Sequence, residues 1–278
     1  MPTPSSLMQV NEPAFPAGAA GNHRISLVTG GARRLGRELC LALAGRGDTV
    51  LIHFKDSQAE AMRTRADCLA AGAREVFTVQ ADLADAGARQ RLVDQAIDLA
   101  GDLHLIVNNA SLFEYDNAAT FEPARFEAHL QTNLIAPVEL TMALHRHHLK
   151  GLSTRRGHVL TLLDQKVENL NVDYLSYTIG KLASSASIRF LAQCCAPCLR
   201  VNAIAPGVTL VSGDMTPEAF EQSSRIAALG QSSTPADIAA ALLMLDELGA
   251  VTGQTLLVDG GQHLVPRGRD VAFEDKSL

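Results

Sequence analysis

The sequence has no tryptophan, few aromatic residues of any kind and no surplus of positive charge. Aromatic residues make up 4% of its 278 residues, and the formal net charge at pH 7 is −6. Non-specific nucleic-acid binding needs a basic surface that displaces phosphate counterions, so this charge argues against a nucleic-acid partner. No apolar run approaches the roughly 18 uncharged residues that span a bilayer, and no basic stretch followed by an apolar one opens the chain. We therefore expect a cytoplasmic protein with no membrane partner.

Cysteine is also scarce. The five cysteines are an odd number in a chain without a secretion signal, which argues against a disulfide framework. Three of them lie within 194–198, where we expect core packing. Three histidines lie within 145–148, where we expect a solvent-facing helix surface because no acidic partner stands at helical spacing. We prefer core packing for the cysteines and a solvent-facing surface for the histidines to a metal site, so no metal is predicted.

What the sequence does contain is an alternation of short apolar runs and longer amphipathic stretches. The runs are nearly continuous in apolar residues, which is typical of parallel strands buried on both faces. They are 24–29, 49–54, 75–80, 103–108, 158–163, 199–204 and 255–259. This repetition predicts an α/β fold, a single-domain Rossmann-type doubly wound parallel sheet of about seven strands with helices on both faces. We expect a flexible leader over 1–22, the domain over 23–264 and a charged C-terminal tail over 265–278.

The first run ends in a glycine-rich turn, 29-TGGARRLG-36, that leads into a helical stretch. Such a turn lets backbone amides approach a pyrophosphate, and the helix N-terminus supplies partial positive charge. A plain tight turn between strand and helix could carry the same glycines, so the loop alone does not decide the matter.

Several spaced motifs taken together resemble the short-chain dehydrogenase/reductase family over nearly the whole body of the chain. They are the loop from Thr29 to Gly36, Asp82 after the third strand, 108-NNA-110 after the fourth, Asn133, Tyr177 with Lys181, and 206-PG-207. The resemblance implies a dinucleotide cofactor held by Gly30, Arg33, Arg34, Leu35, Gly36, Lys55, Ser57, Asp82, Leu83, Asn109, Ala110, Ser111, Tyr177, Lys181, Pro206 and Gly207.

One residue of the loop departs from the usual family pattern. The family loop is Thr-Gly-x-x-x-Gly-x-Gly, and its middle glycine is Arg34 here. The resulting pattern is similar to the pteridine reductase branch, in which that arginine faces both cofactor phosphate and substrate. A guanidinium can bind an oxyanion through a planar fork, which glycine cannot.

The end of the second strand predicts which cofactor is used. An acidic residue there would accept hydrogen bonds from the adenosine ribose and repel a 2′-phosphate. This chain has Phe54 at that place, followed by Lys55, Asp56 and Ser57. Lys55 and Ser57, together with Arg33, make a plausible phosphate site and favour NADPH, although Asp56 weakens that preference.

Tyr177 and Lys181 stand four residues apart, on one face of a candidate helix. By resemblance, Lys181 binds the nicotinamide ribose and lowers the pKa of Tyr177, which transfers the proton, while Asn133 holds a water that links Lys181 to solvent. A surface helix pair would show the same spacing, but Asn133 and the cofactor loop argue against it.

The residue thirteen before Tyr177 is Asp164, where most of the family has serine. An ionised carboxylate cannot donate a hydrogen bond to a ketone, but it can pair with an N–H-rich heterocycle or raise the proton affinity of the tyrosine. Asp164 therefore favours a C=N acceptor over a C=O acceptor, and the pteridine reductases have an aspartate here too.

The stretch 108-NNASLFEYD-116 gives a third agreement with that branch. Phe113 stands where an aromatic residue stacks on the pterin, although a packing role is the alternative, and Ser111 stands where a serine contacts cofactor and substrate. The predicted catalytic residues are Asp164, Tyr177, Lys181 and Asn133. The predicted substrate-binding residues are Arg34, Ser111, Phe113, Asp164, Tyr177, Val208 and Thr209. The loop from 206 to about 233 would form a lid.

The leading hypothesis is an NADPH-dependent reductase of a dihydropterin such as dihydrobiopterin or dihydromonapterin, with dihydrofolate as a further candidate. One alternative is a general carbonyl reductase acting on a keto or acyl substrate, and another is a non-catalytic NADP- or pterin-binding protein. The resemblance also implies a homotetramer. The tail could reach a neighbouring subunit or be disordered.

Overall fold

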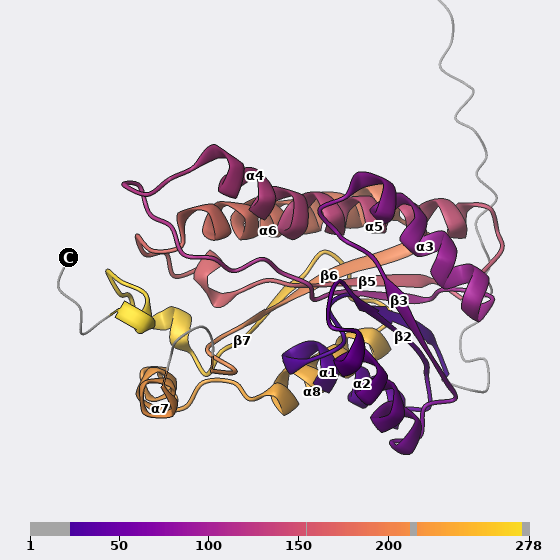
Figure 1. Cartoon of the computed structure of the whole chain (residues 1–278), viewed down its shortest axis with the longest axis horizontal. Helices are drawn as coiled ribbons and strands as arrows, with labels where there is room; N and C mark the ends of the chain where they lie inside the picture. The colour runs from indigo at the N-terminus through magenta and orange to yellow at the C-terminus, as the bar shows by residue number, and fades with distance from the viewer. Residues whose placement is uncertain (1–22, 154, 212–215, 274–278) are drawn as a thin grey trace, which may run out of the picture.

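A computed structural model describes residues 23–153, 155–211 and 216–273, in which one parallel sheet is covered by helices on both faces (Figure 1). All neighbouring strands pair in parallel, in the order β3-β2-β1-β4-β5-β6-β7. The strands are β1 Ile25–Val28, β2 Thr49–Phe54, β3 Glu75–Gln80, β4 Leu105–Asn108, β5 Gly157–Leu162, β6 Leu199–Pro206 and β7 Thr255–Val258. The predicted fold class is confirmed, because each predicted apolar run contains one of these strands or overlaps it. The predicted leader over 1–22 lies outside the described residues.

The helices divide into two layers. Helices α3, α5 and α6 cover one face of the sheet, and α1, α2 and α8 cover the other (Figure 1). The helices are α1 Arg34–Gly45, α2 Gln58–Ala70, α3 Ala86–Ala100, α4 Pro123–Leu130, α5 Ala136–Leu149, α6 Leu175–Cys195, α7 Pro217–Arg225 and α8 Pro235–Glu247. The shorter helical segments are η1 Gln131–Ile135, η2 Gln165–Val167, η3 Gln262–Leu264 and η4 Val271–Phe273. Among the described residues, no helix is long and apolar enough to cross a membrane.

Local signals set the ends of several helices. Helix α8 begins with a capping box, in which Thr234 and Asp237 satisfy each other's backbone amides and Pro235 occupies the first turn. Asp85 accepts a hydrogen bond from the Ala88 amide at the start of α3, and Gly101 ends that helix in the left-handed conformation with φ 84°.

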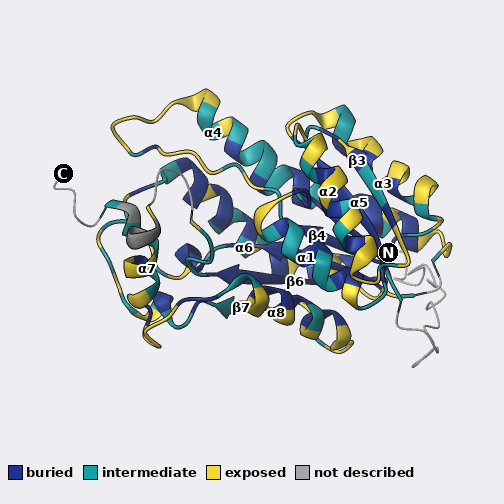
Figure 2. Cartoon of the chain, turned by 60° about the horizontal axis from the view of Figure 1, so that its bottom comes forward, coloured by how far each residue is buried: buried dark blue, intermediate teal, exposed yellow. Residues whose placement is uncertain are grey.

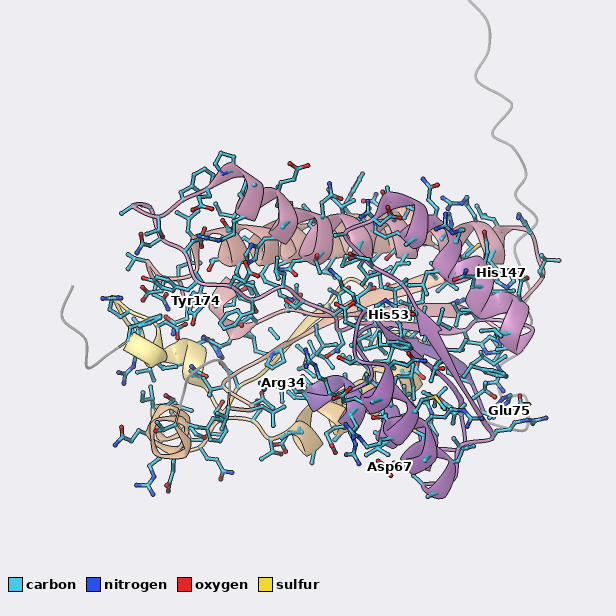
Figure 3. All side chains as sticks on the ribbon, in the orientation of Figure 1. Arg34, His53, Asp67, Glu75, His147 and Tyr174 are labelled. Atoms are coloured by element: carbon cyan, nitrogen blue, oxygen red, sulfur yellow. The ribbon has the colours of Figure 1, made fainter. Side chains whose placement is uncertain are left out.

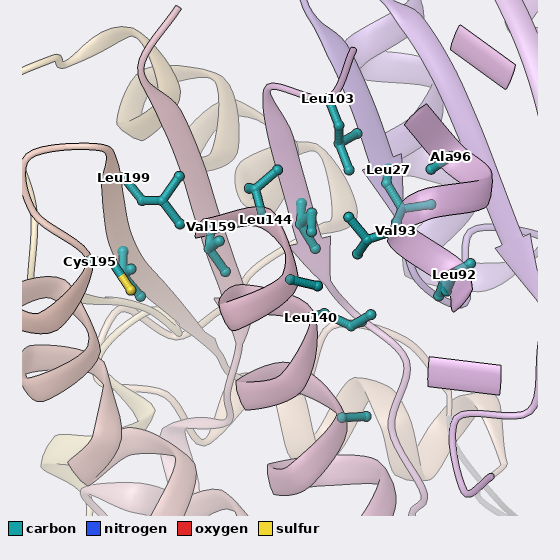
Figure 4. Close-up of a cluster of buried hydrophobic side chains, with 14 of the residues drawn as sticks. Leu27, Leu92, Val93, Ala96, Leu103, Leu140, Leu144, Val159, Cys195 and Leu199 are labelled. Carbon is teal, nitrogen blue, oxygen red and sulfur yellow. The ribbon is translucent and has the colours of Figure 1, made fainter. Parts of the chain in front are cut away.

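Strands β1, β2, β4, β5 and β6 are buried on both faces, which explains why their sequences do not alternate between apolar and polar residues. The edge strands β3 and β7 are partly exposed. Figure 2 shows the central strands in the colour of buried residues, while the outer sides of the helices carry the exposed ones. Figure 4 shows one of the two cores, where Leu27 and Val159 of the sheet meet Leu140 and Leu144 of α5. Cys195 and Cys198 belong to this core, as predicted, whereas Cys194 is exposed.

The prediction that the histidines of 145–148 face solvent is wrong for two of them. His147 and His148 are buried, with 9% and 5% of their surfaces exposed. His147 Nε2 lies 2.7 Å from the carboxylate of Asp102, and His148 Nε2 lies 3.0 Å from the carbonyl oxygen of Leu103. The acidic partner precedes β4 and is 45 residues away, so helical spacing within 145–148 could not reveal it. His147 lies toward the end of the molecule away from Tyr174 (Figure 3).

Candidate active site at the carboxyl ends of the strands

Two adjoining cavities lie at the edge of the sheet where the parallel strands end, the position expected for ligands in this architecture. The larger, called the cleft below, has a volume of about 570 Å³. The smaller, called the pocket, has a volume of about 250 Å³, and Arg34 and Leu35 line both. All the predicted cofactor-binding residues line the cleft except Tyr177, Lys181, Pro206 and Gly207. Tyr177, Pro206 and Gly207 line the pocket instead.

The glycine-rich loop is tied to the neighbouring strand ends by hydrogen bonds. The Thr29 hydroxyl accepts hydrogen bonds from the amides of Asn109 at 2.9 Å and Ala110 at 3.0 Å. Gly30 has φ 62°, in the region that favours glycine. At Gly36, a Cβ atom would lie 2.2 Å from the Gly30 carbonyl oxygen, so only glycine allows the helix to start so close to the loop.

His53 holds the same loop, and the sequence analysis missed it. Its Nδ1 lies 3.0 Å from the Gly30 amide nitrogen, and its Nε2 lies 3.0 Å from the Ala81 carbonyl oxygen. An amide can only donate and a carbonyl can only accept, so the ring carries its proton on Nε2. Burial lowers the pKa of His53 to about 4, which keeps the ring neutral. A polar residue inside the apolar run 49–54 was the signal that could have drawn attention to it.

Basic and acidic side chains meet at the end of the cleft near β2. Lys55 forms an ion pair of 2.9 Å with Asp82, and Asp56 also lines the cleft. Ser57 is the N-cap residue of α2, and its side chain makes no capping hydrogen bond. Arg33 is exposed on the same cavity. This arrangement brings the three predicted phosphate-binding residues to one cavity, with a carboxylate beside Lys55 that partly offsets its charge.

Arg34 adopts a backbone conformation that favours glycine. Its φ is 54°, in the left-handed region, although it starts helix α1. For a residue with a side chain this conformation costs roughly 1–2 kcal/mol. Arg34 lines both the cleft and the pocket, and its Nη2 donates a hydrogen bond of 2.6 Å to the Val211 carbonyl oxygen. The left-handed backbone of Arg34 therefore occurs where its side chain lines both cavities. Backbone strain of this kind is common at functional positions.

Substitution of Arg34 tests this strain. We expect Arg34→Gly to be more stable than Arg34→Ala by about 1 kcal/mol, because both lose the guanidinium but only glycine relieves the left-handed backbone. Urea denaturation of the two variants measures the difference. Equal stability of the two would show that the backbone at residue 34 is not strained.

The hydrogen bond between Asp164 and Tyr177 is central to the pocket. Asp164 follows β5 and Tyr177 lies in the first turn of α6, and the tyrosine hydroxyl donates to Asp164 Oδ2 at 2.8 Å. Burial raises the pKa of Asp164, although hydrogen bonds from the Lys166 amide and Tyr177 partly offset this effect. Burial and the negative charge of Asp164 raise the pKa of Tyr177 well above its usual value. The tyrosine is therefore a protonated donor, whereas the resemblance led us to expect that Lys181 would lower its pKa.

Lys181 and Asn133 lie beside the cavities without lining them. Lys181 is buried and donates a hydrogen bond of 2.7 Å to the Leu162 carbonyl oxygen. Burial lowers the pKa of Lys181 to about 8, partly offset by the charge of Asp164. Asn133 lies in the π-helical segment η1, a feature frequent at functional sites. Its side chain binds both backbone groups of Leu112 and the Ser111 hydroxyl, so it holds the loop that carries Phe113.

Aromatic side chains form one wall of the pocket. Phe113 stacks on Tyr174 with ring centroids 4.2 Å apart and meets Tyr177 edge-on at 4.7 Å. Phe113 nevertheless keeps 41% of its surface exposed. The sequence analysis missed Tyr174, which has φ 58° and directly precedes α6. The scarcity of tyrosine was a signal, because the chain has only three and Tyr174 stands three residues before Tyr177. The third, Tyr115, packs edge-on against Tyr174.

The segment predicted as a tail lines the pocket over its described part, 265–273. Arg269 forms two hydrogen bonds to Asp173, of 2.9 and 3.0 Å, and Phe273 packs against Tyr115 and Tyr174. Just before this segment, Gln262 Oε1 accepts a hydrogen bond of 3.0 Å from the Val208 amide. The domain therefore extends beyond residue 264, and residues 274–278 lie outside the description.

The predicted substrate-binding residues meet in the pocket with one exception. Arg34, Phe113, Asp164, Tyr177, Val208 and Thr209 all line it, whereas Ser111 lines the cleft. Within the expected lid, helix α7 is formed, and residues 212–215 lie outside the description.

Comparison with known proteins gives consistent similarities. A family model described as enoyl-(acyl carrier protein) reductase matches residues 30–263. FolM alternative dihydrofolate reductase 1 from Brucella canis, determined with NADP, is 37% identical with a TM-score of 0.78, covering 86% of this chain and 93% of that one. A putative granaticin polyketide synthase ketoacyl reductase from Streptomyces violaceoruber is 28% identical over 87% of this chain and 96% of its own length. The 1-cyclohexenylcarbonyl-CoA reductase of Streptomyces collinus is 30% identical over 88% of this chain and 89% of its own length.

Proposed function

This chain belongs to the short-chain dehydrogenase/reductase family and is an NAD(P)-dependent oxidoreductase, and from that premise we propose that it reduces a dihydropterin with NADPH. The observation that carries the proposal is the 2.8 Å hydrogen bond from Tyr177 to Asp164, in a pocket that also contains Arg34 and Phe113. Asp164, Arg34 and Phe113 are residues that a carbonyl reductase does not need, and they come from separate parts of the sequence. Their convergence on one pocket supports a shared ligand.

The chemistry of the pocket favours a nitrogen heterocycle. An ionised Asp164 accepts hydrogen bonds and cannot donate one to a carbonyl oxygen, whereas a pterin presents N–H groups that a carboxylate can pair with. Phe113 offers an aromatic face, and offset stacking contributes about 0.5–1.5 kcal/mol beyond burial. Arg34 supplies a planar donor at the junction of the pocket with the cleft.

The cleft fits NADPH. Gly30 and Gly36 line the cleft at the start of α1, where the loop and the helix N-terminus would face a pyrophosphate. Arg33, Lys55 and Ser57 would bind the 2′-phosphate, with the Lys55–Asp82 ion pair reducing the local positive charge. Asn109, Ala110, Pro206 and Gly207 would border the nicotinamide end, and Lys181 would bind its ribose. When bound, NADPH supplies the hydride that reduces the ring carbon of the C=N bond.

The protein's own side chains supply the proton. Because the pKa of Tyr177 is raised, its hydroxyl keeps a proton at neutral pH and is available to the ring nitrogen of the same C=N bond. Asp164 orients that hydroxyl, and Asn133 fixes the loop that presents Phe113. Addition of one hydride and one proton converts C=N to CH–NH, and solvent returns the proton to Tyr177.

Reduction of a keto or acyl substrate is the second candidate, because two of the similar proteins are named as ketoacyl and cyclohexenylcarbonyl-CoA reductases. A test that separates the two measures NADPH oxidation with dihydrobiopterin, dihydromonapterin, dihydrofolate, simple ketones and acyl thioesters. We expect turnover of at least one pterin and little of any ketone. Turnover of ketones or thioesters without any pterin would refute the proposal.

The charge of Lys181 should set the basic limit of activity. Its pKa of about 8 means that the ammonium form predominates below that pH and is lost above it. We therefore expect kcat/KM, measured at limiting concentrations of both substrates, to fall as pH rises through about 8. Tyr177 cannot produce this limb, because its own pKa is raised well above 10. Arginine at position 181 stays charged, so Lys181→Arg should remove the limb, and its persistence would assign it to another group.

A further inference from the structure

The turn that carries Asp164 is attached to the C-terminal segment at two points. Asn169 donates hydrogen bonds to the carbonyl oxygens of Gln262, at 3.2 Å, and Val265, at 3.1 Å. Lys166 forms an ion pair of 2.9 Å with Asp270, which is 104 residues further along the chain. Val265 and Asp270 lie in the segment predicted as a tail, and Gln262 lies just before it.

Lys166 connects this attachment to Asp164 itself. Its backbone amide donates a hydrogen bond of 2.8 Å to Asp164 Oδ1, the oxygen that Tyr177 does not use. Its side chain is 3% exposed and its Nζ lies 5.0 Å from the centroid of the Tyr174 ring. A buried cation needs a compensating partner, and Asp270 provides one.

We propose that Lys166 is a positioning residue for the Asp164–Tyr177 pair, and that the C-terminal segment holds it in place through Asp270. The backbone of Lys166 fixes one carboxylate oxygen, so the other faces Tyr177. Its side chain places a positive charge close to the carboxylate, and Asp270 limits that charge. The C-terminal segment thereby becomes part of the apparatus that orients the proton donor.

Three titratable side chains act directly on Asp164, namely Lys166 from η2 and Tyr177 and Lys181 from α6. Asp270 acts on Tyr177, and Arg34, Arg267 and Arg269 line the same pocket. Lys166 stabilises the ionised form of Asp164, and the charge of Asp270 is felt at Tyr177. The two members of the ion pair therefore act on the Asp164–Tyr177 pair with opposite signs.

The test breaks the ion pair from each side. Lys166→Met removes the positive charge and should raise the pKa of Asp164, whereas Asp270→Asn leaves Lys166 uncompensated and should lower it. Asp270→Asn also keeps the backbone hydrogen bond from residue 270 to Asp173. The pKa is measured by NMR on full-length protein labelled at the aspartate side-chain carboxyl carbon, with Asp164 identified by the signal that Asp164→Asn removes.

An ion pair with a purely structural role predicts a different result, because its loss from either side would shift the pKa of Asp164 in the same direction. Shifts of the same sign, or no shift in either variant, would overturn the proposal. Lys166→Arg retains the cation and should leave the pKa of Asp164 near its original value. Arg63→Met, which removes an exposed ion pair with Glu60, serves as the matched control and should change nothing.

Turnover provides a second measurement, and it rests on the proposed function. We expect kcat for dihydropterin reduction to fall by up to about 100-fold in Lys166→Met and Asp270→Asn, because misplacement of a reacting group by about 1 Å has an effect of that order. An unchanged kcat in both variants would also contradict the positioning role. If the unmodified enzyme reduces no pterin but the opposite NMR shifts are observed, the proposed substrate fails and this inference stands.

Discussion

Tyr177→Phe is expected to lower kcat by about 100-fold or more, the range typical for loss of a general acid. The substitution removes the hydroxyl that donates to Asp164 at 2.8 Å and leaves the ring that meets Phe113 edge-on. Binding of NADPH should change little, since Tyr177 lines the pocket and not the larger cleft. Single-turnover NADPH oxidation measures the chemical step, and quenching of cofactor fluorescence measures binding.

Tyr174→Phe is a matched control for this experiment. It removes the hydroxyl of the neighbouring tyrosine and keeps the ring that stacks on Phe113. We expect this variant to retain most of its activity. If Tyr177→Phe kept comparable activity, the proton would have to come from another donor.

Asp164→Ser is expected to produce the second large effect, a fall in kcat/KM for dihydropterin of about 100-fold. Serine supplies the hydroxyl that most of the family has at this position, but it carries no negative charge to pair with an N–H-rich ring. Activity on simple ketones should be retained or should increase, because a hydroxyl can donate to a carbonyl oxygen. Parallel assays with one pterin and one ketone measure this change of preference.

Asp164→Asn separates charge from shape in the same experiment. Asparagine keeps the size of the side chain and an oxygen that can accept from Tyr177, but it loses the negative charge. We expect pterin reduction to fall in this variant as in Asp164→Ser. An unchanged rate in both variants would show that the carboxylate has no part in the reaction.

The fold and the main features of the site could be predicted because they depend on local patterns. Buried parallel strands require continuous apolar runs, and these are visible in the sequence whatever the rest of the chain does. The ends of those strands must meet at one edge of the sheet, so Arg34, Phe113 and Asp164 could be expected to converge before their contacts were known. The pairing of Asp164 with Tyr177 was implied by the resemblance to the short-chain dehydrogenase/reductase family, in which most members have a serine thirteen residues before the tyrosine. The structure has a hydrogen bond of 2.8 Å between the two side chains.

Other features could not be predicted, because they depend on pairs that no local pattern connects. His147 appeared to be a surface residue until Asp102, 45 residues away, proved to be its partner. Likewise, His53 stands inside an apolar run, and only the fold brings the Gly30 amide to its ring. In both cases a buried polar group is satisfied by a partner from a different element.

The sequence by itself determined the parallel sheet, the glycine-rich loop and the residue types of the Asp164–Tyr177 pair. Only the tertiary structure decided that residues 265–273 belong to the pocket. Their composition is charged and resembles that of a tail, and isolated charges on a chain terminus contribute little to stability in water. Once the fold brings Asp173 and Lys166 within 3 Å of Arg269 and Asp270, the same charges attach the segment to the site. Long-range pairing of charges in a partly buried setting, which periodicity cannot encode, completes this candidate active site.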